Sequence, residues 1–363
     1  MRIGLVIYGS LDTLSGGYLY DRKLVEHLRA CGDEVLVVSQ PWRSYGRHLG
    51  DNVTGAFTRA MDGVEVDVWL QDELNHPSLL ATNAALRRRR TRPPIASIVH
   101  HLRVSEVHPP ALRPLHRGVE RAYLRSCDAF VFNSEATRES VRALVGSLPV
   151  NVVAYPAADH LAIAQRGVRA TGSLRLLAVG NLIERKGLHT TLAALSAIGS
   201  AFDWTLDVVG RADVDPVYAA RCRRAAEVGG VADRVRWRGR LDDAQLAQAY
   251  AASDALVVPS QYEGFGIVYL EALAAGLPVV ASTAGAAGEL VRHGIEGFLV
   301  PPDDAAATAA AIRLLFDDAA RRTLSTAARA RAASHPTWSA TAARIRAFLA
   351  ELCRDASRGA TLE

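Results

Sequence analysis

The sequence lacks the features that would place its 363 residues in a membrane or in an oxidising compartment. No apolar run is long enough to cross a bilayer, and the first residues show neither the charged region nor the apolar region of a signal peptide. The cysteines are few and scattered, with no two at metal-ligand spacing: Cys31, Cys127, Cys222 and Cys353. We therefore expect a cytoplasmic protein with reduced thiols.

A large excess of charge of either sign is also missing. The net charge of +4 and the isoelectric point near 9.0 suit phosphorylated ligands or an anionic membrane surface. They are too weak to predict a nucleic-acid partner. One basic run, at residues 87–90 with Arg92 nearby, has two interpretations. It is either a solvated helix end, or a weak peripheral contact with anionic lipid at the inner membrane face or with a phosphorylated acceptor.

The fingerprint of a dinucleotide-binding protein is absent too. The loop at residues 9–17 has no G-x-G-x-x-G spacing, and the second expected strand ends in Ser39-Gln40 without an acidic residue for a ribose. Both absences argue against a dinucleotide-dependent oxidoreductase. The pair Gly16-Gly17 either lets the backbone approach a sugar or phosphate, or simply begins a helix.

What the sequence does contain is a regular alternation of apolar runs and helical patterns. This alternation predicts an α/β protein with doubly wound parallel sheets, and the length favours two domains. The expected strands are residues 3–8, 34–39, 66–70, 95–100, 129–133 and 150–155, then 174–180, 205–210, 235–238, 255–259, 278–282 and 297–300. We place the domains at residues 1–165 and 166–340. Residues 341–363 are expected to form a tail whose helix packs back on the first domain.

The richest segment is residues 259–278, which predicts a strand end, a glycine turn and a helix. Glu263 lies in the turn and Glu271 on the helix, with seven residues between them. Gly264 and Gly266 allow backbone N–H groups to approach a ligand at the helix N-terminus, where the dipole favours negative charge. The carboxylates suit sugar and ribose hydroxyls, so the segment predicts a site for a polyhydroxylated ligand joined to a phosphate.

Two adjacent cations, Arg185 and Lys186, follow the first strand of the second series. We expect them at the start of a helix, where positive charge works against the helix dipole unless an anion lies between them. Arg can bind a phosphate in a bidentate way and Lys acts as a point charge. The pair therefore predicts a diphosphate clamp, with a solvated loop as the alternative.

Polar residues at other strand ends are weaker candidates. His100 ends the fourth strand and could hydrogen-bond a sugar hydroxyl, whereas His101 points to the opposite side and is expected to be structural. The polar residues 71–77 are either part of the site or a turn and helix start. Ser134 is expected to cap a helix. Asp213 and Asp215 are either paired metal ligands or ordinary residues of a helix start, and we favour the second.

Taken together, these residues resemble family 4 of the retaining glycosyltransferases, the glycosyl transferases group 1, with the GT-B fold. Four pieces carry the resemblance: Gly16-Gly17, Gly180-Asn181-Leu182 with Arg185-Lys186-Gly187, Glu263-Gly264-Phe265-Gly266 to Glu271, and residues 296–302. The resemblance implies two doubly wound Rossmann-like domains that face each other across a cleft, with a C-terminal helix that crosses back to the first domain. It covers most of the chain and is strongest at residues 174–302.

The resemblance also implies roles for individual residues. The catalytic set is His100, Arg185, Lys186 and Glu263. The cations bind the donor diphosphate, Glu263 holds the transferred sugar, Glu271 binds the ribose, and His100 contacts the sugar. Further donor contacts are implied for Gly16, Gly17, Gly180, Asn181, Leu241, Gly264, Phe265, Gly266 and Ile267. One departure is His101, where the family usually has an acidic residue.

The implied reaction moves a sugar from a UDP- or GDP-sugar to a hydroxyl acceptor with retention of configuration, by a front-face mechanism. The acceptor is a sugar, a glycolipid or a small metabolite. The departing phosphate takes the acceptor proton while the cations stabilise its charge, so no metal and no other cofactor is required. The alternatives are a nucleotide-sugar epimerase or a phosphorylase of the same fold, an oxidoreductase, and a non-catalytic nucleotide-sugar binding module.

Overall fold

The first sheet is parallel throughout and contains the N-terminal strands. The computed structural model describes residues 1–13, 15–89, 92–106, 109–164 and 172–360. The sheet has the strand order β2-β1-β3-β4-β5-β6. Its strands are β1 (Arg2–Tyr8), β2 (Glu34–Gln40), β3 (Val68–Asp72), β4 (Ile95–Val99), β5 (Ala129–Phe132) and β6 (Val150–Val153). β1, β3, β4 and β5 are buried almost throughout, as expected for parallel strands covered by helices on both faces.

The second sheet repeats this plan with the order β12-β11-β10-β7-β8-β9, again parallel. Its strands are β7 (Leu174–Val179), β8 (Trp204–Val209), β9 (Val235–Gly239), β10 (Ala255–Val258), β11 (Val279–Ser282) and β12 (Gly297–Val300). Each of the twelve strands overlaps the segment expected for it. The prediction of two doubly wound parallel sheets is therefore confirmed.

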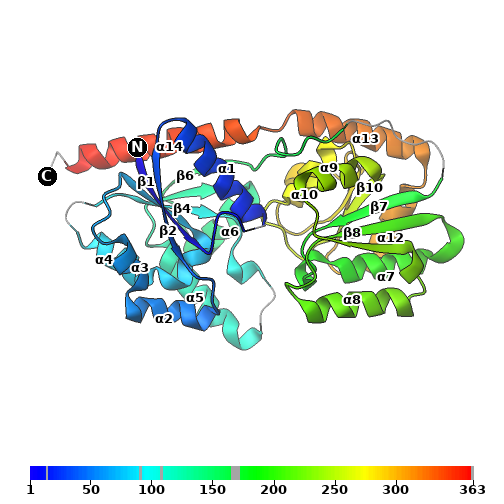
Figure 1. Ribbon diagram of the computed structural model, residues 1–363, viewed down its shortest axis with the longest axis horizontal. Helices are drawn as coiled ribbons and strands as arrows, with labels where there is room; N and C mark the ends of the chain where they lie inside the picture. The colour runs from blue at the N-terminus through cyan, green and yellow to red at the C-terminus, as the bar shows by residue number, and fades with distance from the viewer. Residues whose placement is uncertain (14, 90–91, 107–108, 165–171, 361–363) are drawn as a thin grey trace. The chain divides into compact units, whose positions relative to one another are not determined.

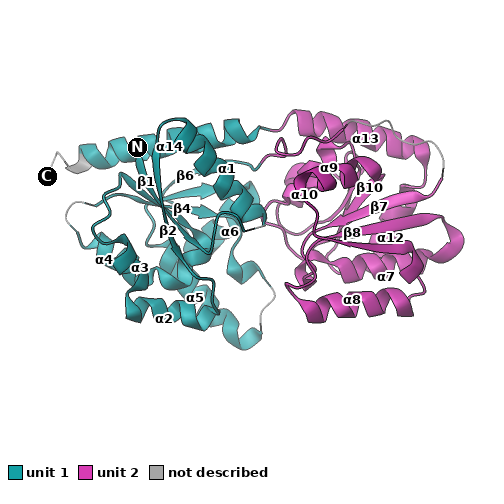
Figure 2. Ribbon diagram, in the orientation of Figure 1, with its two compact units in different colours: residues 1–156, 336–363 teal, residues 157–335 magenta. Residues whose placement is uncertain are grey.

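The chain divides into two compact units (Figure 2). Unit 1 comprises residues 1–156 and 336–363, and unit 2 comprises residues 157–335. The domain boundary that we expected at residues 165/166 lies outside the described residues. The chain returns to unit 1 at Pro336, earlier than the expected tail at 341, and there forms α14 (Trp338–Ala360), which packs against α1 (Gly16–Ala30) (Figure 1).

Helices connect the strands in both units (Figure 1). In unit 1 they also include α2 (Tyr45–Thr54), α3 (Ala56–Met61), η1 (Glu73–Ser78), α4 (Leu80–Arg87), η2 (Arg103–Ser105), η3 (Pro110–Leu112), α5 (Arg113–Leu124) and α6 (Glu135–Val145). In unit 2 they are η4 (Glu184–Lys186), α7 (Leu188–Ile198), η5 (Gly199–Ala201), α8 (Pro216–Val228), η6 (Ala232–Arg234), α9 (Asp243–Ala252), α10 (Ile267–Ala274), α11 (Ala287–Leu290), α12 (Ala305–Leu314) and α13 (Asp318–Ala333). None of the helices in the described ranges is both long and apolar enough to cross a bilayer.

Two of the helical connections in unit 1 are interrupted. Between β3 and β4 the chain first forms the 3-10 turn η1, which contains Pro77, and then the helix α4. Between β2 and β3 it forms two short helices, α2 and α3. The break between these two helices is Gly55, whose φ of 65° lies in the left-handed region.

Polar side chains fix the starts of several helices. The Ser134 hydroxyl accepts a hydrogen bond from the backbone N–H of Thr137 at 3.0 Å, which confirms the expected cap of α6. Asp215 accepts from the backbone N–H of Tyr218 at 2.9 Å and caps α8. Asp213 instead pairs with Arg211. The two aspartates thus have separate structural partners, in agreement with the interpretation that we favoured.

Each sheet has one point where the order of the strands reverses. In unit 1 the chain goes from β1 outward to β2 and then returns to β3 on the other side of β1. In unit 2 it goes from β7 to β8 and β9, then returns to β10 on the other side of β7. Loops diverge at such points and leave a crevice at the carboxyl ends of the strands, where doubly wound proteins bind ligands.

Candidate active site

The reversal point of unit 2 brings together a carboxylate and two cations. Lys186, in the loop after β7, donates a hydrogen bond from Nζ to Oε1 of Glu263, in the loop after β10, at 2.6 Å. Arg185 lies 3.6 Å from Oε2 of the same carboxylate and donates to the backbone carbonyl of Tyr262 at 2.7 Å. Ser260 donates to Oε1 of Glu263 at 2.7 Å. Three of the residues expected in the site are therefore in direct contact.

Electrostatics hold this cluster in its charged form. Burial opposes ionisation of Glu263, but the neighbouring Lys186 and Arg185 outweigh it and lower the pKa of Glu263 to about 2. Burial also lowers the pKa of Lys186, and Glu263 counteracts that effect. The expected conflict between the cations and a helix dipole is reduced, because Arg185 and Lys186 lie in η4 ahead of α7 and Glu263 supplies an anion.

Glycine allows the two loops to approach this closely. Gly187 has a φ of 68°, and a Cβ there would lie 2.2 Å from the carbonyl oxygen of Pro259. The backbone N–H of Gln261 donates to the carbonyl oxygen of Arg185 at 2.7 Å and ties the loops together. A side chain at residue 187 would push β10 and its loop away from the cations. The relative placement of Arg185, Lys186 and Glu263 is thus set by backbone contacts.

The glycine turn after Glu263 leads into α10. Gly266 precedes the helix with a φ of 89°, and a Cβ there would lie 2.3 Å from the ring of Tyr269. Gly264 and Phe265 are buried, while Ile267 begins the helix and is half-buried. The expected order of strand, glycine turn and helix is confirmed. Contact of these backbone groups with a donor remains a prediction.

Glu271 is buried on α10, and both of its oxygens have partners. The Tyr250 hydroxyl donates to Oε2 at 2.6 Å, and Nε2 of His160 lies 3.2 Å from Oε1. Sequence reasoning missed both residues. Tyr250 sits within a helix with no polar signal around it, and His160 lies in a segment whose weak periodicity indicated only a linker. The contacts orient the Glu271 carboxylate before any ligand arrives.

The remaining residues expected at the donor lie near the same edge of the second sheet. Gly180 follows β7, and a Cβ there would lie 3.3 Å from the Lys186 side chain. Gly180, Asn181 and Lys186 line a small cavity with Val258 at the end of β10. Leu241 lies between β9 and α9 and is half-buried. Gly180 and Asn181 thus follow β7, the neighbour of β10, whereas Leu241 follows β9, which β8 separates from β7. Contact of these residues with a donor stays a prediction.

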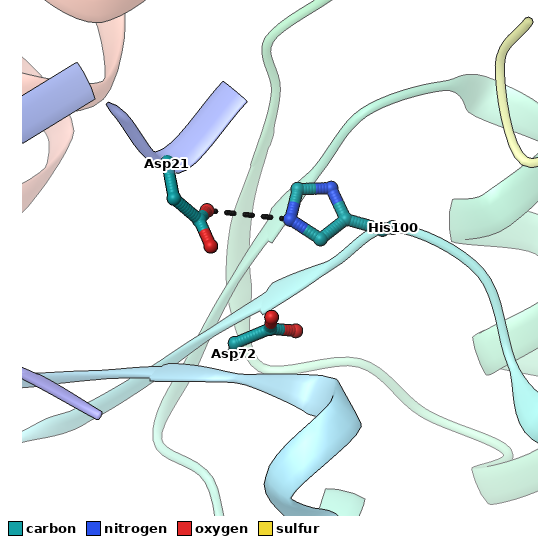
Figure 3. A group of neighbouring side chains, drawn as sticks. All are labelled: Asp21, Asp72 and His100. Carbon is teal, nitrogen blue, oxygen red and sulfur yellow. Dashed lines mark hydrogen bonds and ion pairs between the residues drawn. The ribbon is translucent and has the colours of Figure 1, made fainter. Parts of the chain in front are cut away.

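The reversal point of unit 1 holds a second polar cluster, formed by His100, Asp21 and Asp72 (Figure 3). His100 follows β4, Asp72 ends β3 and Asp21 lies on α1. Nε2 of His100 is 3.3 Å from Oδ1 of Asp21. The sequence singled out His100, but nothing marked Asp21 as its partner. Gly16 and Gly17 are the first residues of α1, and a Cβ on Gly17 would lie 3.1 Å from the His100 ring. Gly17 is thus needed for a close approach to His100.

The expected polar cluster at residues 71–77 is buried beside it. Nδ1 of His76 lies 2.9 Å from Glu73, and Glu120 accepts backbone hydrogen bonds from Arg103 and Val104. Burial raises the pKa of Glu73 and of Glu120 to about 8, and burial lowers the pKa of His76 to about 4. Each cluster offers three atoms of the kind that bind metal ions, within 4.8 Å of one another. In the second cluster, however, these atoms already interact with one another or with the backbone.

Several charged residues that the sequence singled out elsewhere in unit 1 have protein partners. His101 lies 3.0 Å from Glu106, consistent with the structural role expected for it. In the basic run, Arg87 and Arg92 pair with Asp128, and Arg89 pairs with Asp62. Arg90 lies outside the described residues. Three of the arginines expected at a membrane or an acceptor thus already have a carboxylate partner.

Comparison with known proteins adds a family match in unit 2. Residues 173–318 match the family model described as glycosyl transferases group 1. The phosphatidyl-myo-inositol mannosyltransferase of Mycobacterium leprae is 31% identical over 375 residues, which cover 95% of this chain and 95% of that protein. The glycogen synthase of Mycobacterium tuberculosis is 30% identical over 239 residues, or 62% of this chain. That match spans only 54% of the synthase.

Solved structures show the same fold over almost the whole chain. The sucrose-phosphate synthase from Thermosynechococcus elongatus superposes with a TM-score of 0.83 at 24% identity, covering 97% of this chain and 98% of that one. The Anabaena protein Alr3699/HepE, solved in complex with UDP-glucose, gives a TM-score of 0.76 at 20% identity, covering 97% and 100%. At these identities the likeness establishes the fold alone.

Proposed function

The chain belongs to the glycosyl transferases group 1, and we propose that it moves a sugar from a nucleotide-diphosphate sugar to a hydroxyl acceptor with retention of configuration, as a family 4 enzyme. The observation that carries the proposal is the contact of Arg185 and Lys186 with Glu263 at the strand-reversal point of unit 2. A crevice with two cations and a hydroxyl-binding carboxylate suits a ligand in which a sugar is joined to a diphosphate.

The contacts within the cluster support a division of roles. Glu263 is already ionised. It can accept hydrogen bonds from sugar hydroxyls at the positions on its carboxylate that the protein donors leave open. Lys186 and Arg185 bind the diphosphate as a point charge and a planar fork respectively. Glu271, oriented by Tyr250 and His160, binds the ribose hydroxyls. Before the donor binds, Glu263 balances the charge of Lys186, so the lysine is in place without a phosphate.

The chemistry then depends on stabilising the leaving group. As the bond between the sugar carbon and the phosphate oxygen breaks, negative charge grows on that oxygen. Two fixed cations stabilise the charge most strongly when they are already oriented and partly shielded from water. The departing oxygen takes the proton of the acceptor hydroxyl, and the acceptor oxygen bonds to the sugar carbon on the face that the phosphate leaves. Because Arg185 and Lys186 supply the charge that a metal ion supplies in other transferases, we propose that no metal is required.

The names of two relatives suggest which donors and acceptors to test first. One fold relative was solved with UDP-glucose, and a relative that matches over nearly the whole chain is named a mannosyltransferase that acts on phosphatidyl-myo-inositol. UDP- and GDP-sugars are therefore the first donors to test, and a sugar, a glycolipid or a small polyhydroxylated metabolite is the acceptor class. Neither name assigns a substrate to this chain.

A panel of UDP-, GDP- and ADP-sugars tests the proposal. We expect one donor to raise the melting temperature more than its free nucleoside does, and to release nucleoside diphosphate, slowly with water and faster with an acceptor. Donor conversion without any release of diphosphate indicates the epimerase alternative instead. Absence of both stabilisation and release across the panel contradicts the proposed function.

We also propose a weak contact of unit 1 with anionic membrane. The basic run at residues 87–92 accounts for such a contact only in part, because several of its arginines are paired with carboxylates of the protein. Helix α5 instead exposes Arg113, Arg117 and Arg121, with Leu115 46% exposed on the same helix. Each cation near an anionic surface contributes about 1 kcal/mol of attraction. Co-sedimentation with phosphatidylserine vesicles at low salt should fall when the three arginines are replaced by glutamine. No binding by the native protein refutes the contact.

A further inference from the structure

The His100 ring is fixed along one edge and free at the other. Nε2 lies 3.3 Å from Oδ1 of Asp21, while Nδ1 has no hydrogen-bond partner among the residues that the structure describes (Figure 3). The edge of the Tyr20 ring packs on the imidazole, with the two centroids 5.2 Å apart. Asn133 donates to the His100 backbone carbonyl at 2.7 Å, and Gly17 closes another side. The ring therefore has little freedom to turn.

The acidic groups around the ring are buried. Asp21 is fully inaccessible and Asp72 is 1% exposed. Oδ2 of Asp21 has no hydrogen-bond partner within the described part of the chain. An ionised carboxylate in such a place is costly unless a positive charge lies beside it. Among the described residues, the group within hydrogen-bond distance of the Asp21 carboxylate is the His100 imidazole. A protonated ring donates from Nε2 and compensates the charge.

Three acidic groups near the ring favour its protonated form. The acids are Asp21 on α1, Asp72 at the end of β3 and Glu73 at the start of η1. Burial raises the pKa of Asp72 to about 7. Burial alone lowers the pKa of His100, but Asp21, Asp72 and Glu73 together raise it to about 9. At neutral pH the ring then carries a proton on both nitrogens.

We propose that Asp21 is a positioning residue that keeps the His100 imidazole protonated and holds its ring, so that Nδ1–H is presented to an oxygen of the substrate. The inference rests on the proposed function and on the contact between His100 and the transferred sugar that the family resemblance implies. A neutral imidazole can accept or donate, but an imidazolium only donates. His100 then selects a lone pair on a sugar or phosphate oxygen and adds positive charge beside the reacting group.

His100, Asp21 and Asp72 could instead hold a divalent cation. The geometry, however, favours a proton shared between His100 and Asp21. His100 Nε2 and Asp21 Oδ1 face each other at hydrogen-bond distance, which places a proton between them. A metal ligand must be deprotonated and directed at the ion. We therefore infer a histidine–aspartate pair, and a zinc titration is included in the test.

The test is the titration of His100 by NMR in the full-length protein with labelled histidine, its signal assigned by loss in His100→Gln. We expect the His100 pKa in the native protein to lie clearly above 6.5. Asp21→Asn should lower it by about one to three units, the range for loss of an adjacent opposite charge. Asp21→Glu should restore part of the shift. Asp33→Asn is the matched control, because Asp33 is another buried aspartate of unit 1 but pairs with Arg346.

The kinetic arm follows turnover against pH at saturating donor. Turnover should fall as His100 loses its proton, and in Asp21→Asn this alkaline limb should move to lower pH by a similar amount. The Asp33→Asn profile should keep its native limb. A purely structural role for Asp21 changes stability without moving the limb.

Four results overturn the proposal. Three of them are a native His100 whose pKa lies near 6.5, a His100 pKa unchanged in Asp21→Asn, and a shifted pKa with an unmoved alkaline limb. The fourth is loss of the His100 titration on addition of zinc, which assigns the cluster to a metal. Failure of the proposed function is distinguishable, because it shows as absence of diphosphate release by the native protein, while the NMR arm still measures the Asp21–His100 pair.

Discussion

Replacing Lys186 by alanine should lower turnover by about 100-fold or more, the range measured when a donor to a developing oxyanion is lost. Lys186 is the cation whose Nζ is fixed at 2.6 Å from Glu263. Its contribution is expected in the transition state more than in the bound donor, because charge on the leaving oxygen grows only as the bond breaks. The Michaelis constant for the donor should therefore change less than turnover does. Release of nucleoside diphosphate at saturating donor measures both.

The sequence offers a matched control for this variant. Lys23 is the only other lysine in the chain, and it pairs with Glu26 on the exposed face of α1. Lys23→Ala should leave turnover unchanged. Lys186→Met keeps the apolar stem without the charge and should be as slow as the alanine variant. Near-native turnover in both Lys186 variants at saturating donor removes this residue from the mechanism.

Glu263→Gln should lower both turnover and stability. The substitution leaves Lys186 and Arg185 without the carboxylate that balances them, and loss of one member of a buried ion pair costs about 3 to 5 kcal/mol of unfolding free energy. The sugar also loses a charged acceptor, so donor affinity should fall. Urea unfolding, donor titration and diphosphate release measure the three effects.

The stabilisation that ionised Glu263 contributes should decrease in acid. The pKa of Glu263 is lowered from 4.5 to about 2 in the folded protein, so its stabilisation is fully present above pH 4.5 and is lost as the pH falls through about 2. The stability difference between the native protein and Glu263→Gln should therefore be constant near neutrality and shrink in acid. A difference that stays unchanged down to pH 2 contradicts the charged pairing.

Two other glutamates separate stability from function. Glu296 is fully buried and paired with Arg292, so Glu296→Gln should destabilise unit 2 but leave turnover per folded molecule unchanged. Glu271→Gln should mainly weaken donor binding, since its assigned ligand is the ribose. If Glu263→Gln and Glu271→Gln both leave donor affinity and turnover unchanged, the donor-site assignment is wrong.

Local patterns in the sequence were sufficient for the architecture. Apolar runs of strand length alternating with helical periodicity predict parallel sheets, because each strand must be buried on both faces and each connection must cross back over the sheet. Polar residues at the ends of these runs marked the edge of each sheet where we propose that ligands bind. The spacing of Glu263, the glycine turn and Glu271 identified the element of unit 2 that we assign to the donor site. These patterns belong to short segments of the chain, so they can be recognised without knowing which other segments lie nearby.

The partners of these residues depended on the order of the strands in each sheet. Lys186 meets Glu263 because β7 and β10 are adjacent across a reversal of that order, although 77 residues separate the pair in the sequence. Asp21, on α1 after β1, reaches His100 over 79 residues although β3 lies between β1 and β4 in the sheet. His160 reaches Glu271 from a segment without regular periodicity. Hydrogen bonds between distant segments leave no periodic trace, since each side chain is ordinary in its own surroundings. The sequence alone therefore determined the two sheets and the edge where we place the site, while the tertiary structure decided which side chains lie beside one another.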